Sequence, residues 1–190
     1  MTARVYKDTT LTQYLDDLAA RLPAPGGGSA AALVAATGQS LVSMVINFTV
    51  GKPKYAQFEE DLKEILEKSE KLRYEFLALV DLDVTAYNSK DPRQALDIPL
   101  MIARLAYEGI RLCTPLVKKG NPNLISDVAV AAILLESAFA SAYFNVEINL
   151  KFIKDDILTR ELRRELEKKK RTILKVRKAT EVTVGKIIRR

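Results

Sequence analysis

The stretch that decides the fold runs from Pro23 to Tyr55 and reads PAPGGGSAAALVAATGQSLVSMVINFTVGKPKY. Three consecutive glycines precede a run of small and apolar residues that carries no charge before Lys52. Small side chains allow a neighbouring helix to approach closely, so we predict a helix over residues 29–49, at the centre of a bundle or at a dimer interface. Ser29 is its expected N-cap.

Working outward from this segment, the spacing of apolar residues predicts further helices over residues 8–22, 53–88, 93–118, 126–152 and 156–186. The helix over 93–118 is expected to bend near Pro99 and Pro115, and Ser126 is the expected N-cap of the helix over 126–152. The regular alternation of a half-buried strand is absent. We therefore predict an all-α bundle of about six long, mostly antiparallel helices that dimerises through helices. Residues 1–190 form one predicted domain with a basic C-terminal helix at about 155–190.

Composition excludes several kinds of chemistry. The chain has 190 residues, 48% of them hydrophobic, which is enough to bury a core, but it contains no histidine and one cysteine. Ser-His-Asp and Cys-His catalysis and histidine-ligated metal sites are therefore excluded, as is a disulfide within the chain. A reducing cytoplasm fits this composition.

The net charge of +6 is unevenly distributed. Residues 151–190 hold 15 Lys or Arg against 6 Asp or Glu, whereas the other 150 residues hold 15 against 18. Acidic residues alternate with the basic ones, and aromatic residues are absent beyond Phe152, so we expect a solvated, salt-bridged helix rather than a nucleic-acid-binding arm. The most apolar stretches, 30–50 and 128–153, are interrupted by polar residues. This favours buried bundle helices over membrane spans.

Polar residues interrupt the apolar pattern of the segment after the glycines. On a helix, Ser29, Ser40, Ser43 and Asn47 fall along one line. This stripe faces water or another helix, or it forms the wall of a ligand cleft. The three glycines also allow two roles. The free N–H groups of a helix start attract anions, which favours a binding site, whereas a flexible loop is the commoner role of such a run. The run lacks the spacing of a nucleotide-binding fingerprint.

Two carboxylates are candidate acids or bases. Asp83 continues the line of Phe76, Val80 and Tyr87 and so lies at the edge of an apolar face, where it is either ion-paired or a general acid or base. Asp127 lies in a first helical turn, where a negative charge is favourable in any case.

Two asparagines lie on the helix that contains Asp127. Asn145 is 18 residues further along, or roughly 27 Å, so these two residues mark opposite ends of a cleft or of a dimer seam. Asn149 continues the row of apolar residues that runs along this helix from Val128 to Val146. One buried asparagine in such a row often fixes helix register.

Taken together, three segments resemble the folate cyclodeaminase/cyclohydrolase family, which includes the C-terminal domain of formiminotransferase-cyclodeaminase and stand-alone methenyltetrahydrofolate cyclohydrolases. They are the stretch quoted above, LDVTAY around Asp83, and GNPNLISDVAVAA followed by AYFNVEINL. The resemblance covers most of residues 11–150. The stretch 88–96 is shorter than is typical of the family, and the formiminotransferase domain is absent.

The resemblance implies an all-helical homodimer that binds a tetrahydrofolate in a cleft at helix ends. It implies acid–base roles for Asp83 and Asp127, with no metal or redox cofactor. The substrate-binding positions would be Gly26, Gly27, Gly28, Ser29, Ser43, Asn47, Lys52, Ser126 and Asn145. Cyclodeaminase is preferred narrowly over cyclohydrolase, and a non-catalytic folate-binding or scaffold dimer is the alternative.

Overall fold

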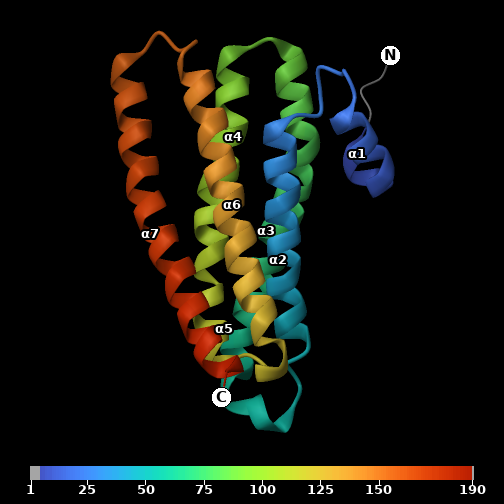
Figure 1. The fold of residues 1–190 in the computed structure, drawn as a ribbon, viewed down its shortest axis with the longest axis vertical. Coiled ribbons are helices and arrows are strands. Elements are labelled where there is room, and N and C mark those ends of the chain that lie inside the picture. The colour runs from blue at the N-terminus through green and yellow to red at the C-terminus, as the bar shows by residue number, and fades with distance from the viewer. Residues whose placement is uncertain (1–4, 190) are drawn as a thin grey trace.

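The computed structural model describes residues 5–189, and every regular element within them is a helix (Figure 1). The prediction of an all-α bundle is confirmed. The α-helices are α1 (Leu11–Ala19), α2 (Gly27–Asn47), α3 (Glu59–Ser89), α4 (Pro92–Arg111), α5 (Cys113–Lys119), α6 (Ile125–Leu150) and α7 (Asp156–Ile188). Short 3-10 turns cover Tyr6–Asp8, Pro53–Phe58 and Pro122–Leu124.

The long helices run alternately up and down, so that chain segments distant in sequence meet at two ends of the bundle (Figure 1). Helix α2 packs against α3 and α6, α4 packs against α6, and α7 covers the outside of α6 and α4. At one end α2 begins and α3 and α6 finish; we call it the glycine end, after Gly26–Gly28. At the other, the far end, α2 finishes and α6 begins. These two ends carry the predicted site residues.

Capping explains where several helices start. The side chains of Thr10, Asp91 and Asp155 each accept a hydrogen bond from a backbone N–H in the first turn of the helix that follows. The two predicted serine caps are wrong. Gly26 occupies the N-cap position of α2, because the N–H of Ser29 is bonded to a carboxylate from α3. Helix α6 follows directly on a 3-10 turn, so Ser126 lies within its first turn and is exposed.

The predicted helix over 93–118 is two helices. Helix α4 ends at Arg111 and α5 starts at Cys113. Pro115 lies in the first turn of α5, where a missing backbone N–H costs nothing, whereas Pro99 lies inside α4 without ending it. The break therefore lies ahead of Pro115. Helix α4 continues through Pro99, whose missing N–H is compensated by Asn149 of α6, as described below.

The leucine spacing predicted α1 but not its buried face. Leu11 and Leu15 are 70% and 56% exposed, whereas Tyr14 is buried at 4% exposure. Tyr14 packs edge-on against Tyr6, whose hydroxyl donates to Asp17. Helix α1 therefore attaches to the bundle through tyrosines, and much of its leucine face points outward.

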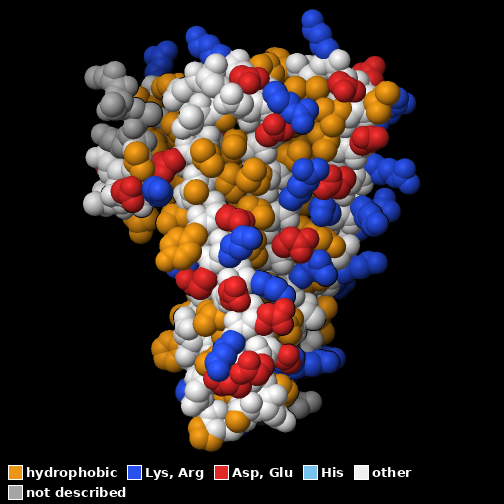
Figure 2. All heavy atoms as spheres, turned by 180° about the vertical axis from the view of Figure 1, so that it is seen from behind, with side chains coloured by type: hydrophobic (Ala, Val, Ile, Leu, Met, Phe, Trp, Pro, Cys, Tyr) orange, Lys and Arg blue, Asp and Glu red, His pale blue; other side chains and the backbone are white. Residues whose placement is uncertain are grey.

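Helix α7 is amphipathic and salt-bridged. Its apolar residues, including Leu162, Leu166 and Ile173, are buried, while Arg163 pairs with Glu147 of α6 at 2.9 Å. In Figure 2, Lys and Arg side chains line the edge of the molecule that α7 occupies, with Asp and Glu among them. This arrangement agrees with the expected solvated helix.

Two segments, Gly27–Asn47 and Pro122–Leu150, are long and apolar enough to cross a membrane by length and composition. In the most apolar window of each, 61% and 39% respectively is buried inside the bundle. Both segments pack against other long helices, as the core helices of a bundle do. The second one leaves much of its apolar surface outside the core.

Candidate active site

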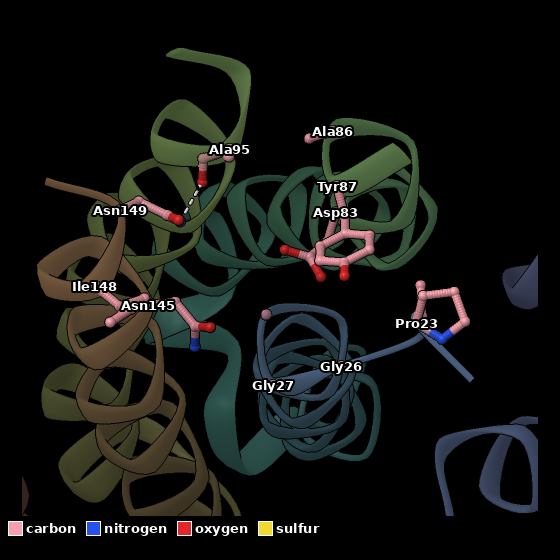
Figure 3. Close-up of a pocket in the computed structure, with 12 residues that line it drawn as sticks. Pro23, Gly26, Gly27, Asp83, Ala86, Tyr87, Ala95, Asn145, Ile148 and Asn149 are labelled. Atoms are coloured by element: carbon pink, nitrogen blue, oxygen red, sulfur yellow. Dashed lines mark hydrogen bonds between the residues drawn. The ribbon is translucent and has the colours of Figure 1, made fainter. Parts of the chain in front are cut away.

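A pocket of about 340 Å³ opens at the glycine end, between α2, α3, α4 and α6 (Figure 3). It draws on the loop before α2, the last turns of α3 and α6 and the first turn of α4. Of the predicted site residues it collects the three glycines, Asp83 and Asn145. Its lining is Pro23, Ala24, Gly26, Gly27, Gly28, Asp83, Ala86, Tyr87, Ala95, Asn145, Ile148 and Asn149.

Asp83 is held against the start of α2. The backbone N–H of Ser29 donates to Asp83 Oδ2 at 2.8 Å. The other oxygen lies over Gly28, where an added Cβ would be 2.0 Å from Asp83 Oδ1. Only glycine fits at position 28 while the carboxylate keeps this place. Gly28 therefore serves close approach between α2 and a side chain of α3, which a flexible-loop role would not require.

Burial raises the pKa of the Asp83 carboxyl above its ordinary value, and the hydrogen bond from Ser29 opposes that rise. Asp83 and Tyr87 are the titratable side chains in the lining of the pocket. A carboxyl group with a raised pKa exchanges a proton more readily near neutral pH, so Asp83 is suited to act as a general acid or base.

Two asparagines of α6 face the glycines and α4 (Figure 3). Asn145 lies beside Gly27, where a Cβ would be 3.4 Å from its Nδ2. Asn149 Nδ2 donates to the carbonyl oxygen of Ala95 at 2.6 Å. That carbonyl lacks its usual helical donor, because Pro99, four residues later, has no N–H. Asn149 thus compensates for the proline inside α4 and ties α4 to α6, as expected of a residue that fixes register.

The remaining predicted site residues lie elsewhere. Ser29 is fully buried behind Asp83 and is not part of the pocket wall. Ser43 and Asn47 line a separate hollow towards the far end with Glu70 and Arg73, and the Ser43 hydroxyl bonds that of Ser69 on α3. The serine stripe of α2 therefore faces α3 along part of its length.

Lys52, Ser126 and Asp127 lie at the far end. Lys52 and Ser126 are exposed, and Asp127 is in the first turn of α6. Within one chain, Asp127 therefore does not share a pocket with Asp83. The catalytic role of Asp127 and the substrate-binding roles of Lys52 and Ser126 stay predictions.

Two residues of this region were missed by sequence reasoning. Tyr87 lines the pocket, and its place one turn after Asp83 on α3 was a usable signal. Tyr14 approaches Ser29 from α1, and no pattern in the sequence indicated it, because the leucines of α1 dominated the periodicity.

An all-helical bundle with a partly buried carboxylate beside a glycine-rich helix start defines a candidate acid–base enzyme. Comparison with known proteins identifies the family of this chain. The family profile described as formiminotransferase-cyclodeaminase matches residues 10–90 and 89–168, so the chain belongs to that family.

Curated relatives include the methenyltetrahydrofolate cyclohydrolase of Methylorubrum extorquens, 38% identical, with 83% of this chain and 87% of that protein covered. The formimidoyltransferase-cyclodeaminase of Rattus norvegicus is 31% identical, over 84% of this chain and 34% of the rat protein, so the chain spans about a third of that enzyme. The crystal structure of formiminotetrahydrofolate cyclodeaminase from Thermotoga maritima superposes with a TM-score of 0.91 at 28% identity. The superposition covers 96% of this chain and 99% of that one.

Proposed function

We propose that this protein is a one-carbon tetrahydrofolate enzyme that acts on the carbon attached to the N5 and N10 nitrogens. The observation that carries the proposal is the partly buried Asp83 carboxyl group, which lines a pocket beside the first turn of α2. Tyr87 and Ile148 add apolar surface to this pocket, which suits the flat rings of a folate. The family and its curated relatives support the substrate class.

The leading reaction is methenyltetrahydrofolate cyclohydrolysis, because the 38% identical relative of similar length carries that name. Water adds to the methenyl carbon and gives up a proton to the Asp83 carboxylate, which produces a tetrahedral carbon. One carbon–nitrogen bond then breaks as the hydroxyl on that carbon becomes the formyl carbonyl. The departing nitrogen takes the proton back from Asp83, and the hydroxyl proton is released to solvent. A single carboxyl group with a raised pKa can serve both steps.

Formiminotetrahydrofolate cyclodeamination is the second candidate, because the Thermotoga maritima structure matches almost the whole chain. N10 attacks the formimino carbon on N5 and loses a proton, and the amino group leaves as ammonia after accepting one. The tetrahedral carbon and the need for a proton shuttle are the same as in cyclohydrolysis. The sequence-based preference for this reaction stays a prediction.

Neither reaction changes an oxidation state, so the proposal includes no redox cofactor. Both reactions need a proton shuttle, which a carboxyl group supplies, so the proposal includes no metal either. It places the enzyme in the cytoplasm, in agreement with the cysteine content.

The test uses the purified protein and both substrates. Loss of the ultraviolet absorbance of 5,10-methenyltetrahydrofolate, measured against the spontaneous rate, reports cyclohydrolysis. Ammonia release from 5-formiminotetrahydrofolate reports cyclodeamination. Turnover of either substrate that is abolished by Asp83→Asn supports the proposal. Saturable folate binding without turnover of either would instead indicate the non-catalytic binding dimer.

We also propose that the protein is a homodimer paired through the outer face of α6 and the adjoining face of α2. Apolar side chains of α6 recur on one exposed face, among them Val130, Ile133, Phe144 and Ile148, at 43%, 37%, 79% and 48% exposure. Such a stripe, interrupted only by Ser137 and Ser141, is suited to burial against a second copy. If the two α6 helices pair antiparallel, the Asp127 end of one subunit meets the Asp83 end of the other.

The dimer is tested by sedimentation velocity of Ile133→Glu, which should shift the protein towards monomer. Met101→Glu is the matched control, because Met101 is exposed to a similar degree, 46%, but lies on α4 rather than on α6 or α2. A wild-type protein that sediments as a monomer at micromolar concentration would disprove the pairing.

A further inference from the structure

Helix α1 reaches the candidate site through one side chain. The Tyr14 hydroxyl lies 3.2 Å from Ser29 Oγ, and the Ser29 N–H donates to Asp83 Oδ2 at 2.8 Å. All three residues come from different helices, and both Tyr14 and Ser29 are buried, at 4% and 0% exposure. A chain of contacts therefore leads from α1 through the first turn of α2 to the carboxyl group on α3.

The orientation of α1 is unusual for an amphipathic helix. Leu11 and Leu15 are more than half exposed, so the face that would normally anchor such a helix contributes little. A buried phenol is costly unless its hydroxyl is hydrogen-bonded, and the partner of Tyr14 is Ser29. The residue of α1 that faces the bundle is therefore Tyr14, and its hydroxyl contacts Ser29, the residue that donates a hydrogen bond to Asp83.

We propose that Tyr14 is a positioning residue for Asp83: its hydroxyl anchors Ser29, and with it the first turn of α2, to α1, so that the backbone N–H of Ser29 stays directed at the carboxylate. The role in turnover rests on the proposed function, but the geometry does not. With Ser29 fixed on one side and Gly28 leaving room on the other, the carboxyl group has one pose against α2. If Tyr14 loses its hydroxyl, the first turn of α2 loses this contact with α1 and shifts more easily relative to α3, so the contact from the Ser29 backbone N–H weakens.

The charge state of Asp83 reports this contact, because its surroundings contain few other titratable groups. Helix α1 presents Tyr14, and the start of α2 presents backbone N–H groups from Gly28 and Ser29. Helix α3 adds Tyr87 from the pocket wall. From α4 and α6 the pocket wall consists of the uncharged residues Ala95, Asn145, Ile148 and Asn149. Burial and the nearby Asp83 charge raise the pKa of Tyr14, so its phenol is neutral at ordinary pH.

The experiment compares Tyr14→Phe with Tyr6→Phe. Tyr6 belongs to the same buried ring pair, but its hydroxyl donates to Asp17. The Asp83 carboxyl is titrated by carbon-13 NMR of the full chain, and its resonance is assigned by its loss in Asp83→Asn. Because an N–H donor favours the charged carboxylate, weakening that donor raises the pKa of Asp83. We expect the midpoint to rise by about half a pH unit or more in Tyr14→Phe and to stay in place in Tyr6→Phe.

Turnover gives the second measurement. The acid limb of the pH–rate profile should move to higher pH in Tyr14→Phe, with kcat lowered about 10-fold, whereas Tyr6→Phe keeps the wild-type limb. Ser29→Ala should reproduce the shift in the Asp83 midpoint, and the double variant with Tyr14→Phe should add little to it, because both changes remove one contact.

An unchanged Asp83 midpoint in Tyr14→Phe, or an equal shift in Tyr6→Phe, would overturn the proposal and leave α1 a purely structural role. A shifted midpoint in a protein that turns over neither folate would support the positioning role of Tyr14, while the proposed function alone would fail.

Discussion

The two ends of the bundle carry similar residues in very different surroundings. At the glycine end, Asp83 is partly buried, accepts a backbone N–H and borders a pocket. At the far end, Asp127 occupies the first turn of α6 beside the exposed Ser126. Both ends offer a helix start, which favours negative charge. At the glycine end, close packing of α2 against α3 places the Asp83 carboxyl group in a pocket wall and partly removes it from water, which raises its pKa.

Asp83→Asn tests this contrast most strongly. An amide cannot transfer the proton, so we expect turnover to fall by about 100-fold or more. Asp81→Asn is the control, because Asp81 lies on the same helix and accepts N–H bonds from Tyr6 and Lys7 instead. Wild-type kinetics in Asp83→Asn would remove this residue from the mechanism.

The same variant has a pH-dependent effect on stability. The folded-state pKa of Asp83 is raised, so the folded protein holds this proton more tightly than the unfolded chain does. That contribution to stability is present at low pH and is lost as pH rises through the folded-state pKa. Asp83→Asn should therefore gain in melting temperature relative to wild type near neutral pH, and the gain should shrink on acidification.

Asp127→Asn tests whether the far end takes part in the reaction. We predict a loss of turnover similar to that of Asp83→Asn only if the far end of a second subunit completes the site. Mixed and reassociated Asp83→Asn and Asp127→Asn proteins would then regain activity, because half of the sites in each hybrid dimer have both carboxylates. Random pairing predicts roughly a quarter of the wild-type rate. Hybrids that regain no activity would show that Asp127 of a second subunit does not complete the site.

Gly28→Ala tests the close approach at the glycine end. The added methyl would collide with Asp83 Oδ1, so the carboxyl group must move, and we expect kcat to fall by about 10-fold or more. Gly26→Ala is the comparison variant, because a Cβ there meets nothing within 4 Å and the loss should be smaller. Equal kinetics in the two variants would show that Asp83 does not need its observed position.

The smallest expected effect concerns Asn149. Asn149→Ala leaves the Ala95 carbonyl without a donor, which should cost about 1–3 kcal/mol of unfolding free energy. Urea denaturation measures this cost. Asn123→Ala is the control, since that asparagine is exposed at the far end. A loss no larger than in the control would refute the assigned contact.

Periodicity and helix-breaking residues predicted the bundle well, because they report local geometry. The seam of α6 from Val128 to Val146 is buried as its spacing indicated. The glycines, Asp83 and Asn145 line one pocket, as the resemblance implied. Their proximity depends on which helices pack together, and local sequence patterns do not determine that. Leu11 and Leu15 show the limit: an apolar stripe predicts a helix, yet not which partner covers it.

The bond between Asn149 and Ala95 links a wall of the pocket to a proline one turn away on α4. Replacing Pro99 by alanine would return an N–H to α4 and free the Asn149 amide to turn towards the pocket. The polarity of the pocket can thus be altered by a substitution at a buried position that does not line it. Divergence in substrate choice among related chains need not begin at a residue that touches substrate.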